Sequence, residues 1–430
     1  SVGSAAPQVV DYFSTEAIEA GARVRVPYGK RTVEGLVLER LPLASQKLAL
    51  KRASFELKKI SSIIEARPCI TPHQLELASW IARHWHCPLA PVLALAIPVF
   101  TRSTPLPASE LPPHQATPQS PVHIEVGSKA DHIAYIRACI EKAEHQTLIL
   151  VPDLSMASWL HQELADIDPL LMHSTAGAKT LRPLWHAIAR GSARVVIATR
   201  MALLAPWAHL SCVIVEDPDN DAYASDRTPR LWAPDAARHL GRIHGAQVAF
   251  LTHTLTPAQE YASLHALATI TEHTTPWPHI QPVIAQPLRT LQDTALDAID
   301  RALAEQQTVL VYSARKAYTT RLECRLCGHS PRCPTCTLPL RHHRINQRTE
   351  DWMLVCYHCG TFTQTSTMCS ACNRTTMAPA GFAGSQKIKK TLEDFLTRRD
   401  IANIRIHLID GDLVRTNAQL AEVTKEVKKK

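Results

Sequence analysis

Eight of the twelve cysteines lie within residues 324–372, in four Cys-x-x-Cys pairs. Two residues between thiols allow one tight turn to direct both sulfur atoms at a single ion, and two such turns complete a closed, structural tetrahedral site. Glycines follow two of the pairs, at Gly328 and Gly360, where a turn with positive φ forms easily. The segment therefore predicts two bound zinc ions. The pairs are Cys324/Cys327, Cys333/Cys336, Cys356/Cys359 and Cys369/Cys372.

The four pairs can be matched into two sites in three ways. Sequential matching joins the first two pairs across only residues 328–332, which is short for bringing two turns face to face. Nested matching is easier, because the stretch between the inner pairs can form a hairpin. The nested outer site comprises Cys324, Cys327, Cys369 and Cys372, and the inner site comprises Cys333, Cys336, Cys356 and Cys359.

Two alternatives to this interpretation exist. His342, His343 and His358 are spare candidate ligands, but eight thiols already fill two closed sites. We expect these histidines to be surface or DNA-facing residues instead. Iron–sulfur or redox chemistry is the other alternative, and the regular paired turns favour zinc over it.

Composition sets broad limits on function. The chain has 47 Lys and Arg residues against 39 Asp and Glu residues, so it is mildly basic. This charge is compatible with a polyanionic partner but does not establish one. No run of 18 apolar residues and no signal-peptide pattern occurs, so we expect no membrane span and no export. Clustered cysteines in such a chain indicate metal rather than disulfides. The scattered cysteines are expected to be unreactive core thiols: Cys69, Cys87, Cys139 and Cys212.

The chain divides into four parts. Residues 1–98 contain a predicted hairpin, with strands at 22–27 and 33–39, and a helix capped by Thr71. Residues 99–121 are rich in Pro, Ser and Thr and form an extended linker.

Residues 122–285 alternate buried strands with helices, which is typical of a parallel sheet. The expected strands are residues 147–151, 194–198, 212–215 and 248–251. Residues 286–430 form a second α/β unit, with strands expected at 309–312 and 404–409 and the cysteine segment 324–372 inserted between them. The basic end, residues 425–430, is expected to be solvated or to mark where a longer chain was cut.

With its parts in this order, the sequence resembles the PriA replication-restart family over nearly its whole length. In the N-terminal unit, Val10-Asp11-Tyr12 resembles the family's Phe-Asp-Tyr element. Residues 23–30 resemble its RVRVPFG hairpin, and residues 84–98 resemble its YYxxPxGxVLxxxLP stretch. The α/β unit and the cysteine segment carry further matches: residues 150–155 to LVPEISL, His173-Ser174 to HS, residues 197–206 to IGTRSALFAP, residues 229–235 to GPRYHARD, residues 315–318 to RRGY, and residues 384–386 to GTQ.

The resemblance implies a superfamily 2 helicase architecture. It implies RecA-like lobes, the second incomplete here, a nested two-zinc insertion, and an N-terminal β-rich domain that binds the 3′ end of a nascent strand at a DNA fork. By match, Asp11, Tyr12, Gly35 and Lys58 would lie in or near that pocket. Val10 stands where the family has an aromatic residue.

The family's phosphate loop is altered in this sequence. A Gly-Lys-Thr sequence should cradle phosphate and hold Mg²⁺. The matching stretch is Gly127-Ser128-Lys129, and Asp131 falls where the lysine belongs. A carboxylate there would repel phosphate, and Lys129 is a misplaced substitute.

The family's other ATPase motifs also depart from its pattern. The Asp-Glu-Glu-His motif is replaced by Glu216-Asp217-Pro218-Asp219, which moves both carboxylates by about a methylene, and misplacement by about 1 Å can cost roughly 100-fold. The Ser-Ala-Thr motif has become Thr252-His253-Thr254. The Pro-rich linker replaces a winged-helix domain, and the chain stops after Asp410-Gly411-Asp412, before the family's arginine finger. ATP and Mg²⁺ are therefore doubtful cofactors, and Glu216 and Asp217 are remnants of a catalytic motif.

Three functions follow from these observations. The first is a non-catalytic binder of abandoned or stalled forks with a 3′ end, which promotes primosome assembly and reloading of the replicative helicase. It would act as a cytoplasmic, nucleoid-associated monomer with primosome proteins as partners, like the helicase-deficient members of the family. The second is an ATP-dependent 3′-to-5′ DNA helicase with divergent motifs. The third is a zinc-ribbon interaction module on an inert α/β scaffold.

Overall fold

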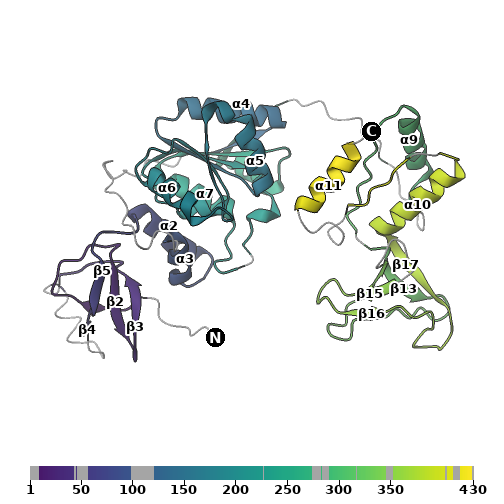
Figure 1. Cartoon of the computed structure of the whole chain (residues 1–430), viewed down its shortest axis with the longest axis horizontal. Helices are drawn as coiled ribbons and strands as arrows, with labels where there is room; N and C mark the ends of the chain where they lie inside the picture. The colour runs from purple at the N-terminus through teal and green to yellow at the C-terminus, as the bar shows by residue number, and fades with distance from the viewer. Residues whose placement is uncertain are drawn as a thin grey trace. The chain divides into compact units, whose positions relative to one another are not determined.

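The computed structural model describes residues 9–42, 45, 57–97, 121–225, 227–273, 282, 290–315, 317–344, 352–401, 404–409 and 417–428 (Figure 1). The chain separates into two compact units, Ser1–Pro276 and Trp277–Lys430, and each is considered by itself. The linker predicted at 99–121 and the Asp410-Gly411-Asp412 stretch lie outside the described residues, Pro121 excepted.

The first unit begins with a small β-structure. Strands β2 (Arg23–Tyr28), β3 (Arg31–Leu36) and β5 (Ser62–Glu65) form an antiparallel sheet in the order β3-β2-β5. The short strands β1 (Tyr12–Phe13) and β4 (Lys58–Lys59) pair in parallel. Alternation in β2 turns Val24 and Val26 into a core with Ile18 and Ala22. The predicted hairpin is therefore confirmed.

Two helices connect this β-structure to the larger sheet of the same unit. Helix α2 (Pro72–His84) begins with the predicted Thr71 cap, which forms a capping box with Gln74, and is followed by α3 (Leu89–Ala96). The buried amide of Gln74 donates to the carbonyl oxygens of Ala96 (3.2 Å) and Leu204 (2.7 Å). Gln74 therefore ties α2 both to α3 and to the α/β lobe.

The α/β lobe is built on a seven-stranded parallel sheet in the order β12-β6-β11-β10-β7-β9-β8. Leu148 and Leu150 belong to one apolar core, whereas the alternate residues Ile149 and Val151 belong to the other. Both faces are therefore covered, and this doubly covered parallel sheet is of the kind found in RecA-like helicase lobes. The strands are β6 (Val122–Val126), β7 (Gln146–Leu150), β8 (Leu170–Met172), β9 (Val195–Ala198), β10 (Leu210–Glu216), β11 (Gln247–Thr252) and β12 (Ala268–Glu272).

The helices of this lobe divide between the two faces. The core that contains Leu148 takes its other apolar residues mainly from α6 and α7, and the core that contains Ile149 takes them from α4 and α5. All four strands predicted in this region are confirmed. The helices are α4 (Lys129–Lys142), α5 (Leu154–Glu163), α6 (Ala178–Ala189), α7 (Ala233–His244) and α8 (Pro257–Leu264).

The second unit contains a five-stranded antiparallel sheet in the order β16-β15-β14-β13-β17. Its small core packs Leu322, Leu340 and Leu354 with Cys333 and Cys356. The strands are β13 (Thr319–Cys324), β14 (Arg341–Arg344), β15 (Trp352–Val355), β16 (Phe362–Gln364) and β17 (Met377–Ala383), and the helices are α9 (Asp293–Ala304), α10 (Ser385–Arg398) and α11 (Asn417–Lys428).

Two strand predictions for this unit are wrong. Residues 309–312 and 404–409 form no strand in the part of the chain that the structure describes, and Leu310 and Tyr312 are 91% and 86% exposed. Apolar runs of this kind become buried strands only when neighbouring strands pair with them. Among the described residues of this unit, no parallel strand is available for that pairing. Over the described helices of both units, none is long and apolar enough to cross a membrane.

Candidate metal centres and the altered nucleotide site

The eight clustered cysteines come together in the nested arrangement. One group joins Cys324 and Cys327 to the last pair, and the other joins the two inner pairs, with all candidate ligand atoms within 4.8 Å of one another in each group. A tetrahedral zinc ion with Zn–S bonds of about 2.3 Å holds its sulfur atoms about 3.8 Å apart. The observed contacts match that spacing: Cys324 to Cys372 3.7 Å, Cys327 to Cys369 3.6 Å, Cys333 to Cys359 3.4 Å, Cys336 to Cys356 3.4 Å and Cys336 to Cys359 3.7 Å.

All four Cys-x-x-Cys turns share one backbone device. The residue four positions after the first cysteine has a positive φ, and its N–H donates to the carbonyl oxygen of that cysteine at 2.9–3.0 Å. Gly328 and Gly360 fill this position in two turns, as the sequence predicted. Thr337 (φ 61°) and Asn373 (φ 54°) fill it in the other two. Asparagine tolerates this conformation, whereas a β-branched threonine is strained there.

Local hydrogen bonds favour the thiolate form of Cys324 in the outer group. The Sγ atom of Cys324 lies 2.9 Å from the hydroxyl of Thr376 and 3.5 Å from the backbone N–H of Cys327. The Thr376 hydroxyl and then the N–H of Cys327 lower the pKa of Cys324 to about 6. The thiolate is the form that binds metal, so this environment prepares the cysteine for coordination.

The spare histidines behave differently from one another. His343 is half-buried and His358 is exposed. His342 is buried on β14 and stacks on Trp352 with ring centroids 4.4 Å apart, so the expectation that it faces the surface or DNA is wrong. Alternation along the strand turns it inward, and burial lowers its pKa to about 4. None of the three belongs to a metal-ligand group among the described residues.

The phosphate-loop remnant joins β6 to α4 and comprises Gly127, Ser128 and Lys129. A side chain of α4 itself occupies the position where a phosphate would bind. Ser128 caps α4, and the carboxylate of Asp131 accepts hydrogen bonds from the Ser128 N–H (2.7 Å) and hydroxyl (2.6 Å). These bonds, from the hydroxyl first, lower the pKa of Asp131. A helix N-terminus attracts one anion, and here the chain's own carboxylate supplies it. Lys129 lies over the ring of Trp159 at 4.7 Å, so its ammonium has a different partner.

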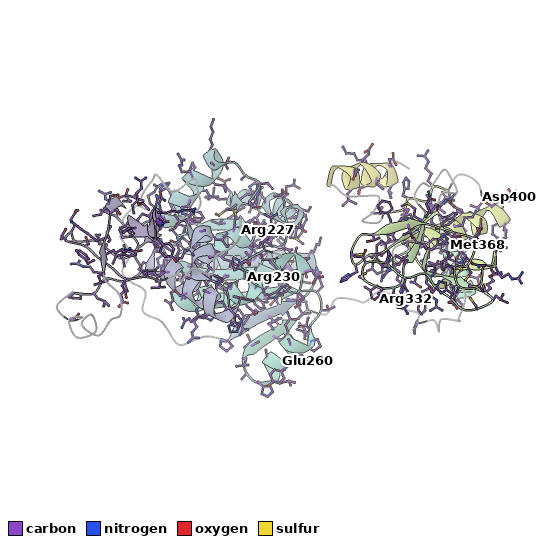
Figure 2. The ribbon with its side chains drawn as sticks, turned by 90° about the horizontal axis from the view of Figure 1, so that it is seen from below. Arg227, Arg230, Glu260, Arg332, Met368 and Asp400 are labelled. Atoms are coloured by element: carbon purple, nitrogen blue, oxygen red, sulfur yellow. The ribbon has the colours of Figure 1, made fainter. Side chains whose placement is uncertain are left out.

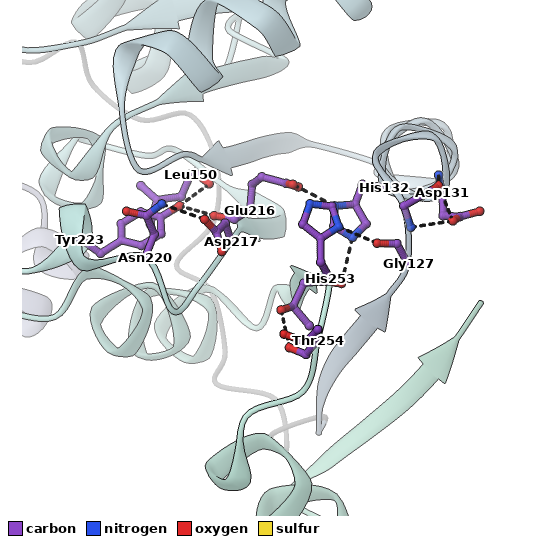
Figure 3. Close-up of polar contacts among 12 residues, drawn as sticks. Gly127, Asp131, His132, Leu150, Glu216, Asp217, Asn220, Tyr223, His253 and Thr254 are labelled. Atoms are coloured by element: carbon purple, nitrogen blue, oxygen red, sulfur yellow. Dashed lines mark hydrogen bonds and ion pairs between the residues drawn. The ribbon is translucent and has the colours of Figure 1, made fainter. Parts of the chain in front are cut away.

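The acidic motif follows β10 at the carboxyl edge of the sheet (Figure 3). Glu216 is buried, and its backbone carbonyl accepts from the Tyr223 hydroxyl at 2.7 Å. Asp217 has a positive φ of 50° and accepts from the side-chain amide of Asn220 at 2.8 Å. Asp219 accepts from Gln259 at 3.2 Å, and burial followed by the charge of Asp217 raises its pKa. The structure therefore directs Glu216 inward and gives both aspartates local partners.

His132 is a site residue that the sequence analysis did not single out. Its Nδ1 lies 2.8 Å from Oε1 of Glu216, and its Nε2 lies 3.1 Å from the carbonyl oxygen of Thr252 (Figure 3). Burial opposes protonation, but the hydrogen bond and charge of Glu216 outweigh it and raise the pKa of His132. The ring of His253 stacks on it at 4.9 Å. The signal that could have singled out His132 is its place in the sequence. It directly follows Asp131, at the position where the family motif has threonine.

The predicted DNA-end residues divide into two places. Tyr12 pairs with Lys58 across β1 and β4, its hydroxyl donates to the Pro27 carbonyl at 2.9 Å, and the exposed Asp11 precedes it. Gly35 instead lines a cavity of about 380 Å³ between β3 and α3. No described hydrogen bond or strand pairing joins Gly35 to the other three.

Comparison with known proteins gives this geometry a family context. Residues 2–98 match the family model of the 3′DNA-binding domain of PriA. The chain is 23% identical to the replication restart protein PriA of Borreliella burgdorferi over 410 residues, which is 85% of this chain and 59% of that protein. Against PriA of Helicobacter pylori strain 26695 the identity is 23% over 96% of this chain and 66% of that protein. The chain is similar to the PriA replication restart proteins over most of its own length.

The similarity to PriA is partial in length, because the chain spans 59% and 66% of these two relatives. Among solved structures, the matches include the Pyrococcus furiosus Hef helicase domain (14% identity, TM-score 0.27, 44% of this chain and 43% of that chain). They also include RecG bound to a three-way DNA junction (12% identity, TM-score 0.27, 56% of this chain and 27% of that chain).

Proposed function

We propose that the chain binds DNA forks carrying a 3′ end and serves replication restart without hydrolysing ATP. The observation that carries the proposal is the pairing of a 3′DNA-binding domain, matched over residues 2–98, with a nucleotide site closed by Asp131. The matched domain predicts recognition of a DNA end. The closed nucleotide site supports recognition that is not coupled to ATP turnover.

The case against an ATPase is electrostatic. The Asp131 carboxylate lies at the N-terminus of α4. Phosphate oxygens would otherwise accept hydrogen bonds from the backbone N–H groups there. Lys129, the lysine of the loop, is held over Trp159, and the Glu216 carboxylate, which should position Mg²⁺, is paired with His132. ATP hydrolysis at this site would therefore require Asp131, Lys129 and Glu216 all to change their hydrogen-bond or ion-pair partners.

Contacts to DNA are expected to be directed mainly at the phosphate backbone. Lys58 and Lys59 are exposed on β4 beside Tyr12. In the lobe, Arg227 and Arg230 are exposed on the loop that precedes α7 (Figure 2). Lysine and arginine at phosphates release counterions, so affinity should fall steeply with salt. Structure-directed recognition of this kind needs no base contacts.

The cysteine segment is proposed to hold two zinc ions and to present a partner-facing surface. Exposed apolar side chains lie at its turns and strands, including Leu326 (67% exposed), Met368 (54%) and Phe362 (66%). Met368 and the exposed Arg332 are labelled in Figure 2. Exposed apolar groups beside basic ones are typical of binding surfaces. We propose primosome proteins as the partners, and the reloading of the replicative helicase as the step that the chain promotes.

Fluorescence anisotropy tests fork recognition. The full chain should bind a labelled fork with a free 3′ end more tightly than plain duplex, equally with and without ATP. Lys58→Glu should reduce that preference, whereas the matched change Lys142→Glu, at an exposed lysine on α4, should leave it unchanged. Equal affinity for fork and duplex would remove the basis of the proposal.

A helicase-loading assay on the same fork tests the restart step. The wild-type chain should increase loading of the replicative helicase, and Leu326→Glu should reduce loading without reducing fork affinity. Loading that is unchanged by the wild-type chain would contradict the restart role while leaving fork binding intact.

A further inference from the structure

A third group of metal-ligating side chains lies at the carboxyl edge of the parallel sheet, apart from the cysteines. It combines His132 from the first turn of α4, Glu216 from the end of β10 and His253 directly after β11 (Figure 3). Their candidate ligand atoms all lie within 4.8 Å of one another. The side chains of His132 and Glu216 are each 1% exposed, whereas His253 is exposed and gives access from solvent.

Both histidines already make the hydrogen bond that orients a metal ligand. Nε2 of His132 lies 3.1 Å from the carbonyl oxygen of Thr252, and Nδ1 of His253 lies 2.7 Å from that of Gly127. A metal-bound histidine almost always donates its second ring N–H to such an acceptor, which fixes the tautomer and the ring orientation. Nε2 of His253 and Nδ1 of His132 are then the nitrogen atoms that would coordinate an ion, which takes the place of the proton that Nδ1 of His132 now shares with Oε1 of Glu216.

The carboxylate supplies an independent sign of a missing ligand. Oε1 of Glu216 faces Nδ1 of His132 at 2.8 Å, but Oε2 is buried and has no hydrogen-bond partner. A buried carboxylate oxygen without a partner is costly and calls for an explanation, an ion being one. An ion placed between Oε2 and the two nitrogen atoms would satisfy it.

We propose that His132, Glu216 and His253 form a binding site for a divalent transition-metal ion of the zinc class, independent of any nucleotide. Two imidazole nitrogens and one carboxylate oxygen are the ligands of open zinc sites. Magnesium prefers an all-oxygen octahedral shell, so the site differs in kind from a magnesium–nucleotide site.

Metal binding requires only a small adjustment of the site. A tetrahedral ion holds N and O ligands about 3.4 Å apart, so atoms now within 4.8 Å need to close by no more than about 1.4 Å. The exposed ring of His253, now stacked on His132, is the member that would shift toward the ion, with Nδ1 still directed at the carbonyl oxygen of Gly127. The bound ion would tie the start of α4 to the ends of β10 and β11. This inference does not depend on whether the chain binds DNA.

Equilibrium dialysis against buffered free Zn²⁺, followed by elemental analysis, tests the site in the full chain. Wild-type protein should bind three equivalents per chain, two at the cysteines and one at this site. Glu216→Gln, which preserves shape, and His253→Ala, at an exposed position, should each bind two. The control His265→Ala, at an exposed histidine directly after α8 and outside the group, should still bind three.

Cobalt gives a second readout that separates this site from the cysteines. Co²⁺ added to protein whose cysteine sites hold zinc should produce ligand-field absorption without sulfur-to-cobalt charge transfer. That signal should be absent in both variants and present in the control. Wild-type protein that binds no equivalent beyond the cysteine sites would overturn the proposal. A third equivalent that persists in both variants would also overturn it, because the ion would then be adventitious on other histidines.

Discussion

The buried His132–Glu216 pair makes an asymmetric prediction about stability. Both side chains are 1% exposed, and their Nδ1 and Oε1 atoms are 2.8 Å apart. His132→Ala leaves the Glu216 carboxylate buried without a counter-charge. Removing one partner of a buried pair leaves an uncompensated buried charge, which is strongly destabilising. Breaking a buried pair costs about 3–5 kcal/mol by the same logic, so we expect a loss in that range.

The reverse change should cost much less. Glu216→Gln keeps an acceptor for the ring N–H of His132, and without the carboxylate the burial of the imidazole favours its neutral form. Only the difference between a charged and a neutral hydrogen bond is then lost, about 1–2 kcal/mol. The double variant should therefore be more stable than the two single losses add up to, with a coupling of about 2–3 kcal/mol.

Urea unfolding followed by tryptophan fluorescence measures these differences, because Trp159, Trp185 and Trp207 all lie in this lobe. Free zinc is held low enough that only the cysteine sites are loaded, so that the pair is measured without an ion. Equal losses for the two single variants, or strict additivity in the double variant, would refute the ion-pair reasoning.

Three further predictions concern other parts of the chain. Burial, followed by the charge of nearby arginines, lowers the pKa of His239 to about 4, so its folded form stays neutral while the unfolded form binds a proton near pH 6.5. Stability should hold above pH 6.5 and fall by up to about 3 kcal/mol as the pH drops to 4, and His239→Gln should reduce that fall in acid unfolding curves. Cys324→Ser should lower bound zinc by one equivalent in elemental analysis, whereas the matched Cys69→Ser, at a buried thiol outside the groups, should not. Thr337→Gly should raise the thermal midpoint of the second unit, equivalent to up to about 1 kcal/mol, because glycine relieves the positive φ of 61°; a lower midpoint would show that no strain is stored there.

The cysteine groups and the parallel sheet could be predicted because their signals are local. A Cys-x-x-Cys pair needs only one turn, and the strand at residues 212–215 is apolar because both faces of the sheet are covered. Thr337 was not predicted to close a turn, because its left-handed backbone is imposed by the turn against the preference of the residue. The buried position of His342 follows from the pairing of β14 with β15, which a single strand sequence does not reveal.

The third ligand group escaped prediction for a different reason. His132, Glu216 and His253 are separated by 84 and 37 positions in the sequence, and only the parallel order of β6, β11 and β10 brings them together. The failed strands at 309–312 and 404–409 show the same dependence, since an apolar run needs neighbours that its own residues do not specify.

The most direct test of recognition without ATP turnover is phosphate release by the full chain with ATP, Mg²⁺ and a saturating fork that has a 3′ end. The account predicts release at the background level, identical in wild-type protein and in Glu216→Gln. DNA-stimulated release by the wild-type chain that disappears in Glu216→Gln would contradict it and would show that the altered site is a working ATPase.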